Sequence, residues 1–344
     1  MRRWFVVLAL ASVMCLGGVA SAQDAYMGDW TGTAQVAGQA DQPLAVYMIA
    51  RGDGRYEARI FSEFNRRVPL LYNLTGNLGG ETFALIDSLP WEPARILRPT
   101  DDGLVVAASL WNAQLAEGGV TGTIAGALKG TFTLRQTVRQ SPTLGAEAPA
   151  GAVVLFDGDN LDAWAPVGRP NDPAPWRLLE GGVMEVQGGD IQTRQNFQNY
   201  RLHIEFRLPY MPTASGQGRA NSGVYQQGRY EVQVLDSYGL DGADNECGGI
   251  YQIARPNVNM CLPPLAWQAY DIEFYGAQLG ADGQKTANAR MTVVHNGVVI
   301  HDNLELPRVT GGANDENEGT PGPIKLQDHG NPVQFRNIWI EPLP

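Results

Sequence analysis

The chain has 344 residues, of which 44% are hydrophobic, and its formal net charge at pH 7 is −11. The hydrophobic content is sufficient for a full-sized core, and the length is typical of two domains. The acidic charge, without basic clusters, argues against nucleic acids and anionic membranes as partners.

The first 22 residues have the pattern of a secretory signal peptide. Arg2 and Arg3 precede the apolar run Trp4–Leu16, and Ala20-Ser21-Ala22 matches an A-x-A cleavage site. The apolar run is too short to cross a membrane. We therefore expect a soluble periplasmic or extracellular protein, cleaved after Ala22, with a charge of about −13 once the two arginines are removed.

The same cleavage would remove Cys15 and leave Cys247 and Cys261 as the remaining cysteines. In an oxidising compartment, two cysteines that flank a Gly/Asn-rich segment indicate a disulfide that closes a short loop. A metal site would need further His or Cys ligands nearby, and the sequence has none there.

Residues 23–140 predict an accessory β-rich domain. The apolar residues alternate in short stretches bounded by Gly, Asp or Asn, which is typical of strands. The clearest of these strands are expected at Gln42–Ile49, Tyr56–Phe61, Gly103–Ala108 and Gly130–Leu134. Residues 141–150 have no periodicity and contain two prolines, so they are predicted to be a linker.

Residues 151–344 alternate more strongly. Tyr200–Leu208 alternates apolar with polar residues, and Asn296-Gly297 between two apolar stretches predicts a tight hairpin. Many antiparallel strands without a convincing helical stretch predict an all-β domain, a jelly-roll β-sandwich. Further strands are expected at Val153–Phe156, Tyr270–Tyr275, Arg290–His295, Val298–His301, Pro323–Gln327 and Val333–Ile340. The last two of these strands are expected to pair. Three histidines on the predicted strands are expected to face solvent: His203, His295 and His301.

The stretch Gly228–Asp236 carries the strongest chemical signal. Glu231 and Gln233 project from one face of a strand, and a bulge of one residue would bring Asp236 beside them. A convergent Glu, Gln and Asp on a sheet face indicates a carbohydrate site with acid/base chemistry. The alternative is an edge strand with a solvated polar face.

Three other polar clusters lie on or beside predicted strands, around Asp190, Asn221 and His329. His329 is a turn residue close in sequence to Asp328 and Arg336, a carboxylate and a guanidinium that can tune its pKa or stabilise an oxyanion. The alternative is a structural or merely exposed histidine. No nucleophile elbow, phosphate loop or metalloprotease signature is present. Four tryptophans could stack on sugars but are more often core residues in a sandwich: Trp164, Trp176, Trp267 and Trp339.

Several motifs occur in the order typical of one family: Leu155-Phe156-Asp157-Gly158 with Leu161 and Trp164, Gly189-Asp190-Ile191, Asn221-Ser222-Gly223-Val224, Tyr230 to Asp236, Trp267 with Tyr270-Asp271-Ile272, His295-Asn296-Gly297, and Leu326 to Gly330 with Phe335-Arg336-Asn337-Ile338. Over about Ala152–Glu341 the chain resembles the 3-keto-disaccharide hydrolase domain family. The resemblance implies a concanavalin-like jelly roll related to laminarinase and lichenase glucanases. It also implies action on glycosides oxidised to a ketone at C3. The region before the linker resembles the accessory β-domain often found ahead of such domains.

The sequence departs from the glucanase pattern E-x-D-x-x-E at its centre. Here the same spacing reads Glu231, Gln233 and Asp236, so the middle carboxylate is an amide. Retaining hydrolysis needs two carboxyl groups about 5 Å apart. The departure disfavours direct hydrolysis and favours another mechanism on the same scaffold.

A ketone at C3 acidifies the proton on C2, so elimination followed by hydration would give net hydrolysis. We expect Glu231 or His329 to be the base and Asp236 to be the partner acid. The other site residues are expected to bind a small-molecule or oligosaccharide substrate: Asp190, Asn221, Gln233, Tyr251, Gln327 and Arg336. No cofactor is expected, although a divalent cation could replace Arg336. The alternatives are a non-catalytic glycan-binding module and a conventional endoglucanase, and the oligomeric state is left open.

Overall fold

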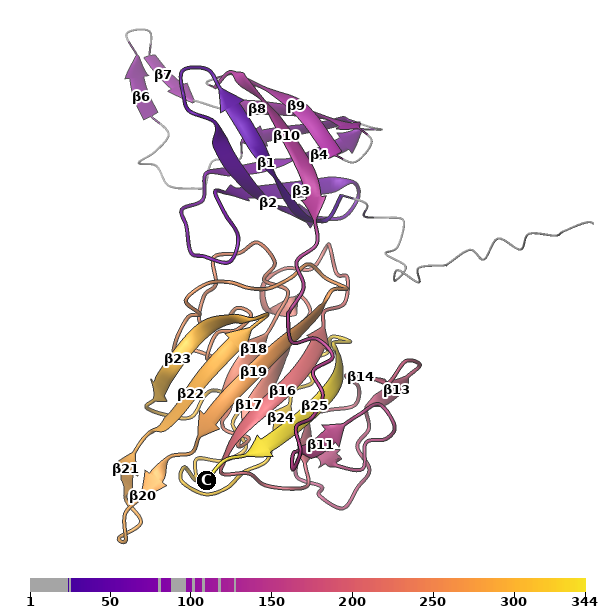
Figure 1. Ribbon diagram of the computed structural model, residues 1–344, viewed down its shortest axis with the longest axis vertical. Helices are drawn as coiled ribbons and strands as arrows, with labels where there is room; N and C mark the ends of the chain where they lie inside the picture. The colour runs from indigo at the N-terminus through magenta and orange to yellow at the C-terminus, as the bar shows by residue number, and fades with distance from the viewer. Residues whose placement is uncertain are drawn as a thin grey trace, which may run out of the picture.

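The computed structural model describes residues 24, 26–79, 82–87, 97–100, 103–106, 109–116, 119–126 and 128–344. These residues form β-strands and one short 3-10 turn, η1, at Gly216–Gly218. They build a barrel followed by a sandwich (Figure 1). The prediction of an all-β chain with a jelly-roll sandwich is confirmed. The predicted signal peptide lies outside the described residues.

The barrel is a closed antiparallel sheet in the order β1-β10-β9-β8-β5-β4-β3-β2. Side chains on alternate positions, including Trp30, Val46, Trp111 and Phe132, fill its interior. Its strands are β1 Gly28–Val36, β2 Gln42–Ala50, β3 Arg55–Phe61, β4 Tyr72–Gly79, β5 Thr82–Asp87, β8 Ser109–Ala116, β9 Gly119–Gly126 and β10 Gly130–Thr137.

A separate hairpin between β5 and β8 consists of β6 Leu97–Thr100 and β7 Gly103–Val106. The last two residues of the predicted strand Gly103–Ala108 lie outside the described residues. The other strands predicted in the barrel agree with β2, β3 and β10, although β10 continues three residues further than expected.

The sandwich packs a large sheet against a small one. The large sheet has the order β13-β14-β25-β16-β19-β22-β23, with β11 also paired to β25, and the small sheet has the order β12-β15-β24-β17-β18. The large-sheet strands are β11 Val153–Phe156, β13 Arg177–Leu179, β14 Val183–Glu185, β16 Asn199–Arg207, β19 Trp267–Tyr275, β22 Ala289–His295, β23 Val298–Leu306 and β25 Gln334–Pro342. The small-sheet strands are β12 Trp164–Pro166, β15 Ile191–Thr193, β17 Ser222–Gln226, β18 Tyr230–Val234 and β24 Lys325–Leu326, and a two-stranded ribbon joins β20 Gln278–Leu279 to β21 Lys285–Ala287.

Alternation along the strands builds the core between the two sheets. Leu202, Ile204 and Phe206 of β16 are buried there, opposite Val224 and Val232 of the small sheet. Every second side chain of such a strand points into this core, and the side chains between them point to the opposite face of the sheet. The polar side of the small sheet therefore becomes available for a site.

The hairpin prediction at Asn296-Gly297 is confirmed. Both residues have positive φ, 50° and 81°, and His295 pairs with Val298 across the turn. The predicted pairing of the last two strands is wrong. β24 pairs with β15 and β17 in the small sheet, whereas β25 pairs with β16 in the large sheet, because the chain crosses from one layer of the sandwich to the other between them.

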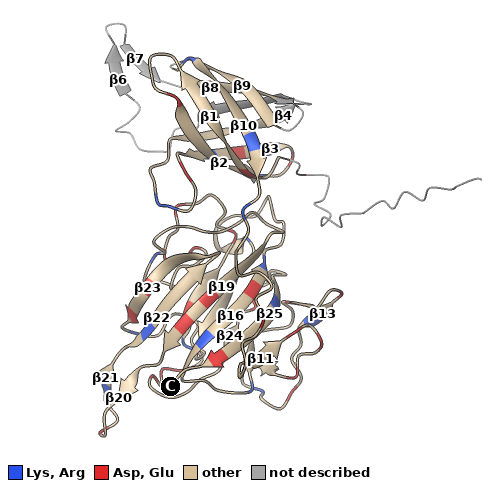
Figure 2. Ribbon diagram, in the orientation of Figure 1, with Lys and Arg blue, Asp and Glu red and all other residues tan. Residues whose placement is uncertain are grey.

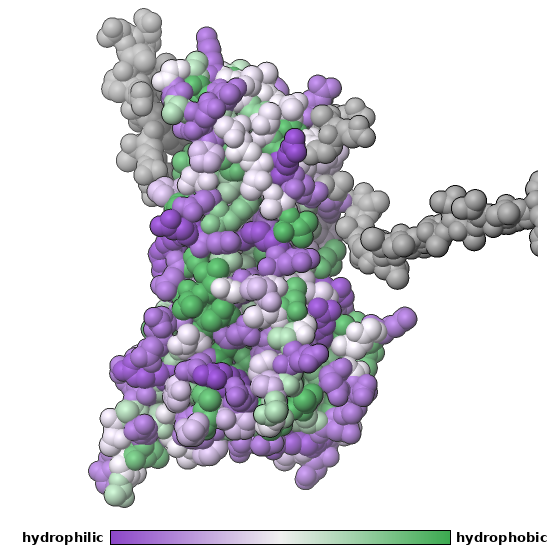
Figure 3. All heavy atoms as spheres, viewed as in Figure 1, coloured by the Kyte–Doolittle hydropathy of each residue, from purple (hydrophilic) through white to green (hydrophobic). Residues whose placement is uncertain are grey.

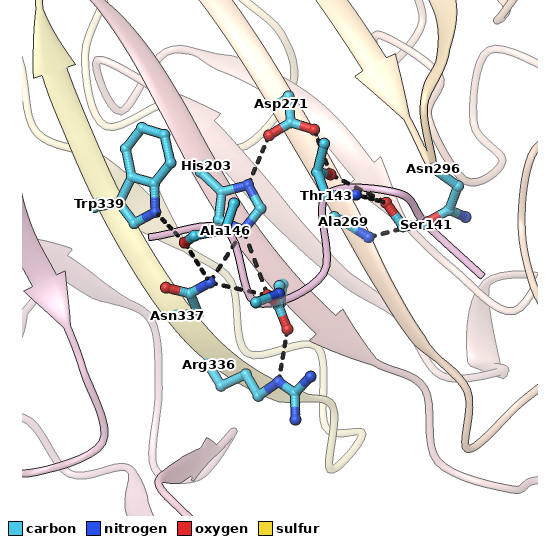
Figure 4. Close-up of polar contacts among 12 residues, drawn as sticks. Ser141, Thr143, Ala146, His203, Ala269, Asp271, Asn296, Arg336, Asn337 and Trp339 are labelled. Carbon is cyan, nitrogen blue, oxygen red and sulfur yellow. Dashed lines mark hydrogen bonds and ion pairs between the residues drawn. The ribbon is translucent and has the colours of Figure 1, made fainter. Parts of the chain in front are cut away.

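Residues 141–150, predicted as a linker, form a strap that crosses the outer face of the large sheet (Figure 4). Thr143 Oγ1 donates a hydrogen bond to Asp271 at 2.7 Å, and the Gly145 N–H donates to Glu205 at 2.5 Å. The carbonyl of Ala146 accepts bonds from two side chains of β25, those of Asn337 and Trp339. The strap is thus a packed element of the sandwich.

The three histidines expected to face solvent are buried, so this prediction is wrong. His203 does lie on the outer face of β16, but the strap covers it, and it stacks on Trp339 with ring centroids 5.1 Å apart. His295 belongs to the buried series of β22. His301 is buried and donates from Nε2 to the carbonyl of Gly248 at 2.7 Å.

The expected disulfide between Cys247 and Cys261 is absent, since both are free thiols in the buried core. Each thiol has another hydrogen-bond partner. Cys247 Sγ lies 3.2 Å from the Tyr270 hydroxyl, and Cys261 Sγ donates to the carbonyls of Leu235 at 3.6 Å and Leu262 at 3.4 Å. Both thiols therefore have hydrogen-bond partners in the absence of a disulfide.

The surface is polar and mixed in charge. Acidic and basic residues lie side by side on the strands of the large sheet (Figure 2). On the face seen in Figure 3, hydrophobic residues occur in small groups between hydrophilic ones. None of the described segments forms a helix long and apolar enough to span a lipid bilayer.

Candidate active site

The outward face of the small sheet carries a polar cavity of about 380 Å³. This volume lies within the range of small-ligand pockets. The lining comes from β17 and β18 and from loops beside them: Gln217, Asn221, Tyr225, Glu231, Gln233, Tyr251, Gln252, Gly311, Gly312, Gln327 and His329. Six of the nine residues predicted for catalysis or substrate binding therefore line one cavity: Asn221, Glu231, Gln233, Tyr251, Gln327 and His329.

Glu231 is the only carboxylate among the described residues that line this cavity. It is 2% exposed and lies opposite Tyr225 in the β17–β18 pairing. Its carboxyl group occupies the space above Gly223, where an added Cβ would come within 2.2 Å of Glu231 Oε1. The absence of a side chain at position 223 thus makes room for the carboxyl group.

Burial raises the pKa of Glu231 to about 7, because the carboxylate loses its hydration. A hydrogen bond with Tyr225 and the charge of Lys325 act in the opposite direction, while the negative charge of Asp190 raises the pKa further. A carboxyl group that titrates near neutrality can accept and return a proton at physiological pH.

The amide of Gln233 supports the carboxyl group. One of its terminal atoms lies 3.1 Å from Glu231 Oε1 and 2.9 Å from the carbonyl of Ser222. The other terminal atom lies 3.0 Å from Gln217. The amide at the position of the glucanase's central carboxylate therefore lies within hydrogen-bond distance of the Glu231 carboxyl group.

Two side-chain oxygens beside the cavity have no hydrogen-bond partner among the described residues. These are Asn221 Oδ1 and Gln327 Oε1. Their amide nitrogens are engaged, with Asn221 donating to the carbonyl of Gln217 at 2.9 Å and Gln327 donating to the hydroxyl of Tyr225 at 3.2 Å. A buried acceptor without a partner is costly, so this pair suits a ligand that brings hydroxyl donors.

Lys325 is a neighbour of the site that the sequence analysis missed. Its ammonium group lies 3.7 Å from the centre of the Tyr225 ring, pairs with Asp190 at 3.5 Å and donates to the carbonyl of Gly312. Burial lowers the pKa of Lys325. Lys325 lies on β24, and Gln327, two residues later, directly follows that strand, so both side chains point to the outward face, and this alternation was a usable signal.

Asp190, His329 and Tyr251 occupy different positions around the cavity. Asp190 does not line it directly but pairs with Lys325. His329 lies at the exposed side of the lining. Tyr251 is held beside β18 by a hydrogen bond from its N–H to the carbonyl of Glu231 at 3.3 Å.

The structure does not place Asp236 in the cavity. The β17–β18 register runs without a shift and β18 ends at Val234, so no bulge turns Asp236 towards Glu231. Instead Asp236 is buried and paired with Arg219 at 2.5 Å. The predicted convergence of three polar residues is therefore limited to Glu231 and Gln233.

Arg336 also lies away from the cavity, on the outer face of the large sheet (Figure 4). It pairs with Glu205 at 2.6 Å, and its guanidinium lies 4.1 Å from the centre of the Trp267 ring. The prediction treated Leu326 to Gly330 and Phe335 to Asn337 as one cluster, but β24 and β25 belong to different layers. Within the described residues, no group of three or more His, Cys, Asp or Glu side chains is arranged to hold a metal ion.

A family model described as a 3-keto-alpha-glucoside-1,2-lyase-like domain matches residues 151–341. The chain belongs to this family. The match covers the two sheets of the sandwich up to the penultimate residue of β25, including every residue that lines the cavity. The resemblance stated from the sequence motifs is confirmed.

Two known proteins are similar to this chain. A 3-keto-disaccharide hydrolase of Bacteroides thetaiotaomicron is 23% identical over an alignment of 256 residues, and the comparison covers 56% of this chain and 79% of that protein. A provisionally assigned glycosyl hydrolase of Parabacteroides distasonis, known from a crystal structure, is 39% identical with a TM-score of 0.53. That comparison covers 57% of this chain and 85% of the other.

Proposed function

We propose that this protein cleaves the glycosidic bond of 3-keto-glycosides, including 3-keto-disaccharides, by proton abstraction at C2, elimination and hydration. The family and the name of the Bacteroides relative support the substrate class. The observation that carries the mechanism is Glu231: one buried carboxyl group with a pKa of about 7, held beside a polar cavity without a second carboxylate among its described lining residues.

In this mechanism Glu231 takes the proton from C2 of the keto-sugar, and the electrons left on carbon delocalise onto the C3 oxygen as an enolate. The enolate then expels the C1 oxygen, which leaves with a proton. Water adds to the resulting enone, with its hydroxyl bonding to C1 and a proton returning to C2. A base with a pKa near the working pH is well matched to such a transfer.

Other residues that line the cavity bind the sugar, stabilise the enolate and protonate the leaving group. Asn221 Oδ1 and Gln327 Oε1 accept hydrogen bonds from sugar hydroxyls. Tyr251 donates to the enolate oxygen, and His329, at the exposed side, protonates the leaving group. His329 takes this role because Asp236 is occupied by Arg219.

A glucanase mechanism fits the cavity less well. Retaining and inverting enzymes both require a second carboxyl group across the glycosidic bond. Asp236 would be that group by sequence, but it is buried against Arg219. The geometry therefore favours a substrate whose own ketone makes the C2 proton acidic.

The test is turnover of a 3-keto-glycoside beside its unoxidised parent. We expect cleavage of the keto compound only, and loss of that cleavage in Glu231→Gln, which keeps the shape of the side chain and removes its basicity. Equal cleavage of both compounds would contradict the proposal. Binding of the keto compound without turnover would identify a glycan-binding module instead.

Reaction in heavy water distinguishes elimination from direct displacement. Elimination and hydration should place deuterium at C2 of the released keto-sugar, because solvent returns the proton to that carbon. The free product must be incubated alone as a control for exchange after release. Product without label at C2 would rule out the elimination route.

A further inference from the structure

The long loop between β18 and β19 forms one side of the cavity. We call residues 235–262 of this loop the wall loop. The Gly248 N–H donates to the carbonyl of Gln233 at 2.9 Å, and the Gln233 N–H donates to the carbonyl of Gly249 at 2.9 Å. The wall loop thus runs along the edge of β18 like an added strand, and it delivers Tyr251 and Gln252 to the cavity lining.

The opposite side of the wall loop is held by the barrel. Arg67 follows β3 and reaches three backbone carbonyls of the loop. Its Nε donates to Asn257 at 3.0 Å, and its Nη2 donates to Pro256 at 2.9 Å and to Gly242 at 3.3 Å. These carbonyls lie before and after the residues that line the cavity, so one guanidinium ties together both ends of the lining segment.

Other contacts strengthen the same junction. Arg59 of β3 donates to the carbonyl of Gly239 at 2.9 Å and to Asp241 at 3.2 Å. At Gly239, where φ is 75°, an added Cβ would lie 2.8 Å from Ile49 of β2. Barrel and loop are therefore closely fitted as well as hydrogen-bonded.

A buried polar group completes the junction. The hydroxyl of Tyr238 donates to Asp29 of β1 at 2.8 Å, and Arg139 pairs with the same carboxylate through Nε and Nη2 at 2.8 and 2.9 Å. The pair is nearly inaccessible to solvent, with side-chain exposures of 10% for Arg139 and 2% for Asp29. Charge-assisted bonds of this kind are short and strong when they are shielded from water.

We infer that the barrel braces the wall loop and that Arg67 is a positioning residue for the substrate-binding side of the cavity. A loop without such support belongs to the regions of a protein that open most readily. Loss of the brace would let Tyr251 and Gln252 move relative to Glu231, and small displacements of positioning groups are costly for catalysis. The catalytic consequence rests on the proposed function, whereas the bracing itself does not.

Amide hydrogen exchange of the full-length chain tests the brace without any substrate. In Arg67→Ala, the amides of residues 248–252 should exchange about ten times faster, while the amides of β16 and β19 keep their protection. Arg66→Ala is the matched control, because Arg66 directly precedes Arg67, carries the same charge and has a side chain that is 75% exposed. Unchanged exchange in residues 248–252, or equal acceleration throughout the sandwich, would overturn the inference.

Kinetics of the same variants test the consequence for catalysis. With a 3-keto-glycoside, Arg67→Ala should lower kcat/KM by about tenfold or more, mainly through KM, while Arg66→Ala stays near the parent. A normal KM in Arg67→Ala together with locally faster exchange would refute the positioning role and leave only a structural brace. If the parent itself turns over no keto-glycoside, the proposed function fails and the exchange result still decides the brace.

Discussion

At the scale of single residues, Glu231 gives the site its dependence on pH. Its pKa is raised to about 7, so the carboxylate needed as a base forms only as the pH approaches neutrality. We expect the acid limb of the kcat/KM profile on a keto-glycoside to have its midpoint near pH 7, with kcat/KM falling about tenfold for each pH unit well below it. The measurement is a pH–rate profile, and a midpoint near 4.5 would contradict the assignment of Glu231 as the base.

Gly223 should be as necessary for activity as Glu231 itself. A methyl group at position 223 would meet the carboxyl group of Glu231 at 2.2 Å, so Gly223→Ala must displace that carboxyl group. We expect a loss of activity of about a hundredfold with the fold retained. Gly218→Ala serves as the control because an added Cβ there meets no atom within 4 Å. Equal activity of the two variants would argue against a fixed position for Glu231.

The sequence predicted the pairing of Glu231 with Gln233 because strand alternation is a local property. It failed for Asp236 and Arg336 because their surroundings depend on non-local structure. Asp236 meets Arg219 from a different segment, and Arg336 lies on the strand that follows a change of sheet. Lys325 was missed because a lone lysine on a short strand gives no motif, even though its alternation with Gln327 was visible.

At the scale of elements, the strap explains why the polar face of β16 is buried. Glu205 accepts hydrogen bonds from Gly145 of the strap and from Arg336 and Asn337 of β25. Burial alone would raise its pKa, but hydrogen bonds with His203, Asn337, Gly145 and Arg336 dominate and hold the pKa of Glu205 at about 2. The stability that Glu205 contributes is therefore present above pH 4.5 and is lost as the pH falls towards 2.

Glu205→Gln should lower the free energy of unfolding by about 2–3 kcal/mol at pH 7, because a buried charged acceptor is replaced by a neutral amide. Urea unfolding measures this difference. Glu273→Gln on β19 removes a partly exposed partner of Arg201 and should cost less than about 1 kcal/mol. Equal costs in the two variants would mean that the strap contributes little to the stability of the sandwich.

At the scale of the whole molecule, the strand pattern allowed the prediction of an all-β chain, but not of a closed barrel. A barrel differs from an open sheet only in the pairing of its first and last strands, here β1 with β10, and those strands are far apart in the sequence. The close junction between barrel and sandwich could not be predicted from the sequence either. It depends on arginines of the barrel and of the segment after it, whose partners are backbone carbonyls or carboxylates far away in the sequence, and such contacts have no sequence signature.

Export is a further prediction for the whole molecule. Arg2, Arg3 and the apolar run that follows them predict cleavage after Ala22. Expression of the full-length chain in a bacterial host should yield a protein outside the cytoplasm whose intact mass corresponds to a start at Gln23. Recovery of the uncleaved chain from the cytoplasm would contradict the prediction.

The pairing of Gly248 and Gly249 with Gln233 has a consequence for solubility. β18 is the last strand of the small sheet, and an uncovered last strand offers its backbone to any other chain that can add a strand. The segment that carries Tyr251 covers much of this edge. A change that detaches the segment would therefore expose a strand edge that can pair with other chains. It would also disorder the lining of the cavity. The same few residues therefore both cover the edge of β18 and hold the lining of the cavity.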